Sequence, residues 1–208
     1  IIDPEKEILK LYREKLEKDI LQKRKMKELG KLPAVTLDGI KYEVSANIGE
    51  PPEVYLAIEN GADGIGLLRT EFLIMKAESM PSEQEMAREL SKIIARLEDK
   101  PIVVRVFDIG GDKPVPSLRL PKELNPFLGL RGIRLLLSHK DLFRRQLRAI
   151  LRNNIRGNVK IMFPMVSLVE EVLEAKKIVD EVAKELKSER ITIGKYEVGI
   201  MVETPLSL

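Results

Sequence analysis

Short apolar runs and helix-like segments alternate five times along this chain. The apolar runs lie at residues 42–48, 64–68, 102–107, 159–163 and 197–202. Such alternation predicts parallel strands joined by right-handed helical crossovers. Chains of this kind commonly close as eight-stranded barrels. We therefore predict an α/β fold of the parallel (β/α)8 TIM-barrel type, incomplete, with about five of the eight strands present.

The segments between these runs supply the expected helices, at residues 51–60, 82–97, 128–137, 141–154 and 168–186. Ser82 and Glu85 have the spacing of a capping box at the start of the second. Residues 102–107 are almost continuously apolar, as a strand covered on both faces requires. A loop rich in Gly and Pro is expected at residues 109–125.

A long helix is expected to precede the first strand. Asp3 can cap its start, Pro4 suits its first turn and Gly30 ends it. Its apolar residues recur every four positions on an otherwise polar rod, which is typical of a connector or a packing arm. We therefore divide the chain into a connecting helix, residues 1–31, and a partial barrel, residues 32–208.

The composition excludes several classes of protein. The net charge of +3 is too balanced for bulk attraction to nucleic acid, and no cysteine is present to form a disulfide, a thiolate metal site or a cysteine nucleophile. No run reaches the roughly 18 apolar residues of a membrane span, and we expect no leader. We expect a soluble cytoplasmic protein that binds no nucleic acid and enters no membrane.

Two other features have ordinary explanations. Arg144, Arg148, Arg152 and Arg156 recur every four residues opposite an apolar helix face, which indicates a solvated face. His139, the single histidine, precedes an expected helix and is interpreted as a surface or capping residue.

Charged side chains gather where the expected strands end. Ligands of parallel barrels bind at the carboxyl ends of the strands, so these residues should share one mouth. Guanidinium groups bind phosphate or carboxylate with paired hydrogen bonds, and a carboxylate beside them can hold Mg²⁺. Gly110 and Gly111 would let backbone approach a ligand. The candidate anion-binding residues are Arg69, Arg105, Arg131 and Lys113, and the candidate metal ligand is Glu203.

Each candidate also has a structural interpretation. Arg105 interrupts an apolar strand and needs a partner, which Glu203 or Asp108 could supply. Arg69 could form a local surface pair with Glu71. Arg131 could be a helix-surface charge, and Asp108, Asp112 and Lys113 could be ordinary loop charges. Glu203 could be a plain structural partner.

Six ordered motifs resemble the enzymes that use phosphoenolpyruvate (PEP). They lie at residues 46–49, 60–73, 104–113, 125–134, 161–165 and 199–205, and include Arg69-Thr70-Glu71-Phe72 and Val202-Glu203-Thr204-Pro205. Residues 32–39 make the resemblance strongest to the enzyme I branch of the bacterial PEP:sugar phosphotransferase system. The resemblance covers nearly the whole chain in the same order and spacing.

The resemblance implies a PEP-binding TIM barrel. Arg69 and Arg105 match the family's phosphate-binding arginines, Arg131 matches a further substrate-site arginine, and Glu203 matches one of two Mg²⁺ carboxylates. In the family, PEP phosphorylates a histidine on a separate domain, enzyme I passes the group to the carrier HPr, and the intact protein is a homodimer. The chain resembles the connecting helix plus five-eighths of the barrel, so the phosphohistidine and the general acid, its catalytic residues, are expected elsewhere.

Several readings therefore stay open. The chain is expected to be the PEP-binding part of a PEP-protein phosphotransferase, inactive by itself. The alternatives are a part of PEP synthase or pyruvate phosphate dikinase, a non-catalytic module that binds PEP or a protein, and an unrelated Mg²⁺-dependent lyase barrel. Two uncovered sheet edges would also favour self-association, with exchange of elements between copies.

Overall fold

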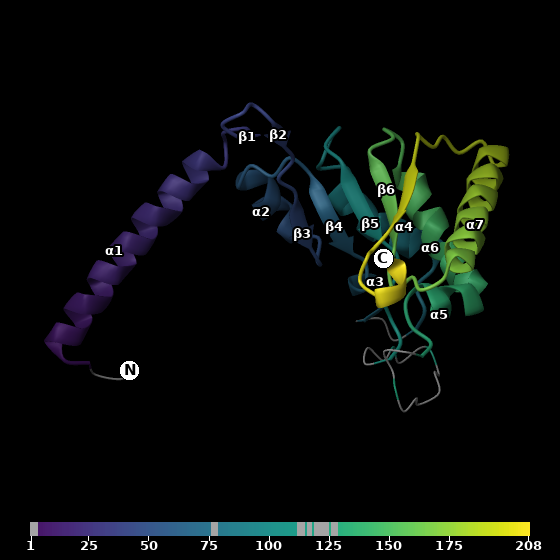
Figure 1. The fold of residues 1–208 in the computed structure, drawn as a ribbon, viewed down its shortest axis with the longest axis horizontal. Coiled ribbons are helices and arrows are strands. Elements are labelled where there is room, and N and C mark those ends of the chain that lie inside the picture. The colour runs from purple at the N-terminus through teal and green to yellow at the C-terminus, as the bar shows by residue number, and fades with distance from the viewer. Residues whose placement is uncertain (1–3, 76–78, 112–114, 116–117, 119–124, 126–128) are drawn as a thin grey trace.

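The computed structural model describes residues 4–75, 79–111, 115, 118, 125 and 129–208. Its centre is a five-stranded parallel sheet in which every strand pairs with the next along the chain (Figure 1). Sequential order of parallel strands is the arrangement of a barrel wall, although β3 and β7 are both edges among the described residues. The strands are β3 (Ala46–Ile48), β4 (Ile65–Arg69), β5 (Ile102–Arg105), β6 (Val159–Phe163) and β7 (Glu197–Ile200).

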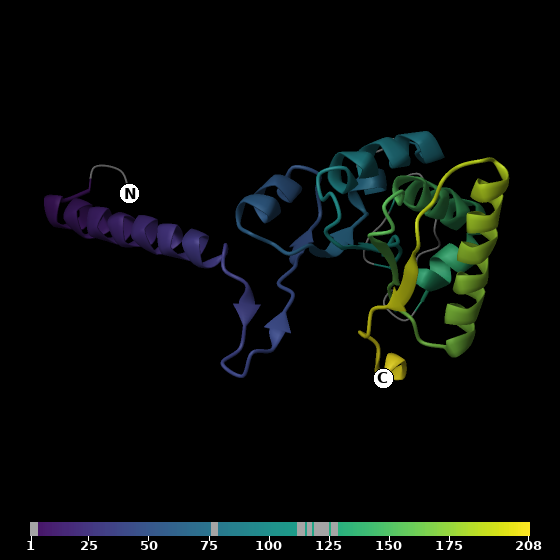
Figure 2. The ribbon, with the colours of Figure 1, turned by 90° about the horizontal axis from the view of Figure 1, so that it is seen from above.

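Helices lie against one face of this sheet, and no helix among the described residues lies against the other (Figure 2). Ser82 and Glu85 form the predicted capping box at the start of α4, each bonding the other's backbone N–H. The helices are α2 (Glu53–Glu59), α3 (Phe72–Met75), α4 (Glu83–Ile94), α5 (Ile133–Ser138), α6 (Lys140–Asn153) and α7 (Val169–Ser188), followed by the 3-10 turn η1 (Pro205–Ser207).

The core lies between the sheet and these helices. Successive residues of a strand point to opposite faces, and in β5 Ile102 and Val104 are fully buried. Phe143 of α6 meets Phe163 of β6 edge to face, with ring centroids 6.1 Å apart. The core thereby fixes the face on which each strand presents its polar residues.

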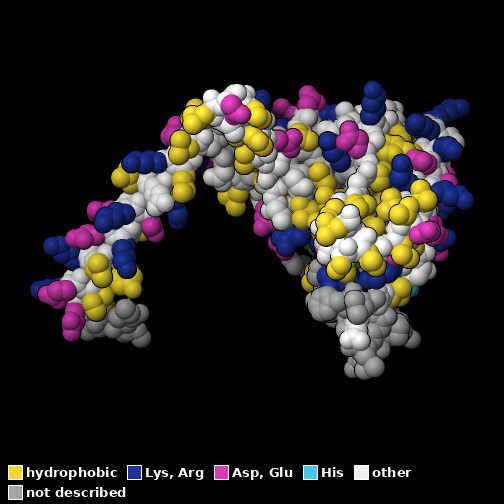
Figure 3. All heavy atoms as spheres, viewed as in Figure 1, with side chains coloured by type: hydrophobic (Ala, Val, Ile, Leu, Met, Phe, Trp, Pro, Cys, Tyr) yellow, Lys and Arg dark blue, Asp and Glu magenta, His cyan; other side chains and the backbone are white. Residues whose placement is uncertain are grey.

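The N-terminal helix α1 (Lys6–Leu29) extends away from this body and buries none of its residues (Figures 1 and 2). Figure 3 shows apolar side chains distributed among the charges along it. At its base, a Cβ added to Gly61 would lie 2.0 Å from the carbonyl oxygen of Gly30, so these two glycines allow a close backbone approach. Asp3, the predicted cap, lies outside the described residues, and the observed N-cap is Glu5 without a side-chain hydrogen bond.

Some predicted boundaries were wrong. The run at residues 42–48 is not one strand, because β2 (Lys41–Tyr42) pairs antiparallel with β1 (Ala34–Val35) in a separate hairpin. The helix predicted over 128–137 begins only at Ile133, and the short helix α3 was not predicted. The fourth run, 159–163, matches β6.

The arginine stripe on α6 is not simply solvated, which corrects the sequence interpretation. Arg148 bonds Glu83 of α4 at 2.6 Å and Glu189 at 2.7 Å, and Arg144 bonds Glu185 of α7 at 2.8 Å. The hydrogen bond from Arg148 lowers the pKa of Glu189. The stripe therefore fastens three helices to one another.

Among the described residues, no helix combines the length and apolarity needed to cross a membrane.

Candidate functional site

Two of the candidate arginines end neighbouring strands at the same level. Arg69 of β4 and Arg105 of β5 are partners in the parallel register, and the row continues through Met162 of β6 and Gly199 of β7. Residues at one level of adjacent parallel strands face the same side. The row lies on the face opposite the helices, because the adjacent residues Leu68, Val104 and Ile161 point into the core.

Arg105 is buried and held by carboxylates from two directions. Its Nη2 donates to Glu71 Oε1 at 2.8 Å, and its Nη1 lies 3.6 Å from Asp108 Oδ2. The side chains of Arg105 and Glu71 are 8% and 9% exposed, which makes this a buried ion pair. Glu71 Oε1 also accepts from the backbone N–H of Asp108 at 3.1 Å. The pair therefore fixes the guanidinium against the loop after β5.

Arg131 joins the same group through Asp108. Its Nε and Nη2 donate to the two carboxylate oxygens of Asp108 at 2.8 and 3.1 Å, the forked geometry that suits guanidinium. Glu71, Arg105, Asp108 and Arg131 thus form one buried cluster of alternating charge, which we call the charge cluster. Burial makes its members mutually dependent, since each would be costly without a partner.

Gly110 explains how Arg131 reaches this position. Arg131 does not start a helix as predicted; it forms an isolated bridge with Gly110. Gly110 has φ +97°, and a Cβ there would lie 2.2 Å from the carbonyl oxygen of Leu130. Gly110 was expected to let the backbone approach a ligand. In the structure it instead lets the backbone next to Arg131 come close.

Arg69 differs from the other two arginines because it is exposed. No hydrogen bond or ion pair joins its guanidinium to another described residue, and it does not pair with Glu71 as one interpretation held. Gly49 leaves space for it, since a Cβ there would lie 2.9 Å from Arg69 Nη2. The pKa of Glu53 is lowered mainly by hydrogen bonds from the N–H groups of Gly49 and Glu50, with a smaller contribution from Arg69.

Glu203 lies past the end of β7, exposed, and its Oε1 accepts the N–H of Met165 at 2.7 Å. Arg105 Nη1 reaches toward the same strand end, 3.7 Å from Met201 Sδ. Glu203 forms no ion pair with Arg69, Arg105 or Arg131, so it is not the partner of Arg105. The described residues bring together no group of three acidic or histidine side chains that could hold a metal ion.

Lys113 and the adjoining Asp112 lie outside the described residues. His139 joins α5 to α6, and its Nδ1 lies 2.9 Å from Ser138 Oγ and 3.2 Å from the carbonyl oxygen of Leu135. It sits at the N-cap of α6 without capping that helix through its side chain.

The sequence interpretation underestimated Glu71 and Asp108. Both were treated as ordinary charges, although Asp108 was also named as a partner for Arg105. The signal was the arginine within an apolar strand, because a buried cation requires a nearby anion. Glu71 meets that requirement from the end of the neighbouring strand.

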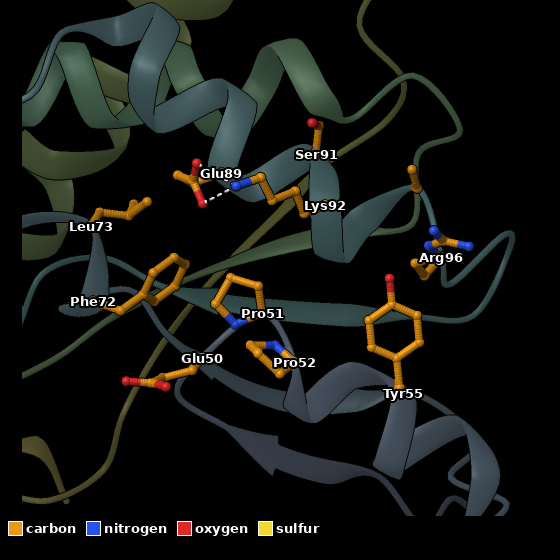
Figure 4. Close-up of a pocket in the computed structure, with 11 residues that line it drawn as sticks. Glu50, Pro51, Pro52, Tyr55, Phe72, Leu73, Glu89, Ser91, Lys92 and Arg96 are labelled. Atoms are coloured by element: carbon orange, nitrogen blue, oxygen red, sulfur yellow. Dashed lines mark hydrogen bonds and ion pairs between the residues drawn. The ribbon is translucent and has the colours of Figure 1, made fainter.

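A groove of about 920 Å³ lies elsewhere, between α2, α3 and α4 (Figure 4). It is lined by Pro51, Pro52, Phe72 and Tyr55, and the guanidinium of Arg96 lies 5.3 Å from the centre of the Tyr55 ring. Lys92 points to Glu89, with which it pairs at 2.6 Å (Figure 4). No member of the charge cluster lines this groove, so the strand ends remain the candidate site.

Comparison with known proteins agrees with the family resemblance seen in the sequence. A family profile described as PEP-utilising enzyme, PEP-binding domain, matches residues 23–208. The phosphoenolpyruvate-protein phosphotransferase of Priestia megaterium is 47% identical over 208 residues, which is 100% of this chain and 36% of that protein. Those of Bacillus subtilis (strain 168) and Geobacillus stearothermophilus are each 47% identical over 206 residues, 99% of this chain and 36% of the relative. The chain thus spans about a third of the length of these relatives.

Proposed function

This chain belongs to the PEP-utilising enzymes, by their PEP-binding domain, and on that premise we propose that its strand ends bind the phosphate and carboxylate of PEP. The observation that carries the proposal is the pairing of Arg69 with Arg105 on adjacent strands, with Arg131 joined to Arg105 through Asp108.

The charges of the site support an anionic ligand. Within the charge cluster, the two arginines are balanced by the two carboxylates. Arg69 lies outside that balanced group, is exposed and forms no ion pair with another described residue, so it is the arginine most ready to bind phosphate.

Arg105 keeps hydrogen-bonding capacity for a ligand. Its Nε is buried and has no hydrogen-bond partner among the described residues. A buried donor without a partner is costly, and a ligand oxygen would relieve that cost. Glu71 and Asp108 would hold the guanidinium in place while the ligand is absent.

We propose that the chain is part of a PEP-protein phosphotransferase of the enzyme I type. The names of the relatives favour this parentage over PEP synthase or pyruvate phosphate dikinase. In this proposal the five strands are part of a TIM barrel, residues 1–31 connect that barrel to another domain, and a histidine on that domain takes the phosphoryl group and passes it to HPr. His139 is unsuited to that role because it is engaged within its own helix junction.

For Mg²⁺ we propose one ligand, Glu203. Glu203 would supply one carboxylate, and waters and the phosphate of PEP would supply the other oxygen ligands that Mg²⁺ takes. The PEP-binding proposal depends only on the arginines.

Calorimetric titration of the chain with PEP, with and without Mg²⁺, tests the proposal. Arg69→Met should abolish or strongly weaken binding, and higher salt should weaken wild-type binding. Arg96→Met removes the same charge from the outer groove and should leave the affinity unchanged. Wild-type chain that releases no heat with PEP and shows no binding by a second method would refute the proposal.

Phosphoryl transfer is tested separately. Mixed with labelled PEP and HPr, the chain alone should transfer no label. Sedimentation of the same sample reports whether copies of the chain associate, as the two sheet edges among the described residues favour. Label on HPr without added protein would contradict the assignment of the phosphohistidine to another domain.

A further inference from the structure

A chain of buried hydrogen bonds lies directly behind the two arginines that end β4 and β5. Gln146, on α6, accepts the N–H of Phe107 at 3.1 Å through Oε1 and donates from Nε2 to Thr70 Oγ1 at 2.9 Å. Thr70 in turn donates to the carbonyl oxygen of Arg105 at 2.7 Å. Thr70 and Gln146 are both fully buried.

Each of these hydrogen bonds has only one possible donor and one possible acceptor. The N–H of Phe107 can only donate, so the amide oxygen of Gln146 must face it. The amide nitrogen must then donate to Thr70, whose hydroxyl proton is left for the carbonyl oxygen of Arg105. Because no member can reverse its role, the arrangement specifies a single geometry.

These hydrogen bonds lie just beyond the end of the ladder between β4 and β5. The ladder between β4 and β5 ends with the pair Arg69 and Arg105. Thr70 is the next residue of one strand, and Phe107 lies two residues beyond the end of the other. Gln146 therefore joins the two strand ends to each other and to the helix layer. If either strand end moved, buried polar groups would lose their hydrogen-bond partners. The free-energy cost of that loss resists movement of either end.

We propose that Thr70 and Gln146 are positioning residues that set the spacing of the Arg69 and Arg105 guanidinium groups. This inference rests on the proposed binding of PEP for its functional consequence, but the positions of the arginines can be observed without PEP. Neither residue touches the ligand in this proposal; both act through the backbone that carries the arginines.

The molecule supplies a matched control at the opposite end of the sheet. Asn154, which follows α6, is also fully buried and also bonds two backbone groups. Its Nδ2 donates to the carbonyl oxygen of Lys195 at 2.8 Å, and its Oδ1 accepts the N–H of Val159 at 3.1 Å. Val159 begins β6, so Asn154 supports the amino ends of the strands and not the arginines.

The test compares four variants of the 208-residue chain: Thr70→Val, Thr70→Ser, Gln146→Met and Asn154→Leu. Thr70→Val keeps the shape and removes the hydroxyl, whereas Thr70→Ser keeps the hydroxyl. The readouts are the PEP dissociation constant, the melting temperature and the NMR resonances of the Arg69 and Arg105 Nε–H groups.

We expect Thr70→Val and Gln146→Met to weaken PEP binding about tenfold, near the lower limit seen when partners of metal ligands are removed. They should also shift or broaden both Nε–H resonances, while Thr70→Ser stays close to wild type. Asn154→Leu should lower the melting temperature as Gln146→Met does. It should change neither the PEP dissociation constant nor the arginine Nε–H resonances.

Unchanged affinity and unchanged arginine resonances in Thr70→Val would overturn the inference. So would an equal loss of affinity in Asn154→Leu, because general destabilisation would then explain the effect. If the wild-type chain binds no PEP, the proposed function fails, and the arginine resonances alone decide whether Thr70 and Gln146 position these side chains.

Discussion

Replacing Glu71 by Leu should strongly destabilise the protein. Glu71 and Arg105 are less than a tenth exposed, and the substitution leaves Arg105 with Asp108 as its remaining anion, at 3.6 Å. Removing one partner of a buried ion pair costs about 3–5 kcal/mol. Because Asp108 still compensates in part, we expect a value near about 3 kcal/mol. For a chain of this length that corresponds to a fall in melting temperature of roughly 6–12 °C.

The double variant Glu71→Leu/Arg105→Met separates this mechanism from simple loss of packing. Replacing both partners by apolar side chains removes the uncompensated charge, so the double variant should lie within about 1 kcal/mol of the wild type. Urea and thermal unfolding of the four proteins of the cycle give the coupling energy, expected to exceed about 2 kcal/mol. A loss below about 1 kcal/mol for Glu71→Leu, as in solvated surface pairs, or additive single effects would refute the reasoning.

Three further predictions concern stability. Ser82→Ala removes the capping box of α4 and should cost about 1 kcal/mol in urea unfolding, with Thr at this position restoring most of it. Arg148 lowers the pKa of Glu189 below its ordinary 4.5, so this pair stabilises the fold fully above that pH and less as the pH falls through the lowered pKa. Glu189→Gln should therefore reduce the loss of melting temperature on acidification, and an unchanged acid profile would contradict this. Burial, and a hydrogen bond to Asp180, raise the pKa of Tyr196 from 10.0 to about 12, so its contribution is complete below pH 10 and is lost as the pH rises toward 12. Tyr196→Phe should remove the tyrosine ionisation near pH 12 from an ultraviolet titration.

Much of the fold could be predicted because the relevant signals are local. The apolar run at 159–163 and the capping residues Ser82 and Glu85 lie within a few positions of the structure they specify. The run at 42–48 was misjudged because its two halves pair with different partners, a hairpin strand and the parallel sheet. No local pattern separates those two uses.

The candidate site divides in the same way. The ends of the strands can be recognised in the sequence, so Arg69 and Arg105 could be placed at one edge of a sheet from the sequence alone. The partners of Arg105 could not be chosen, because the choice depends on which strand lies beside β5 and how the following loop folds. Glu203 was an equally charged candidate, and the structure selects Glu71 and Asp108.

The sequence alone determined the alternation of strands and helices and the edge at which charged groups gather. Only the tertiary structure decided that Arg105 and Arg131 share the Asp108 carboxylate and that the backbone of Leu130 packs closely against Gly110. It also decided that Gln146 of α6 hydrogen-bonds the strand ends. The physical reason is range: periodicity and capping act between neighbours in the chain, whereas buried charges and amides are satisfied by whatever the packed fold brings within about 3 Å.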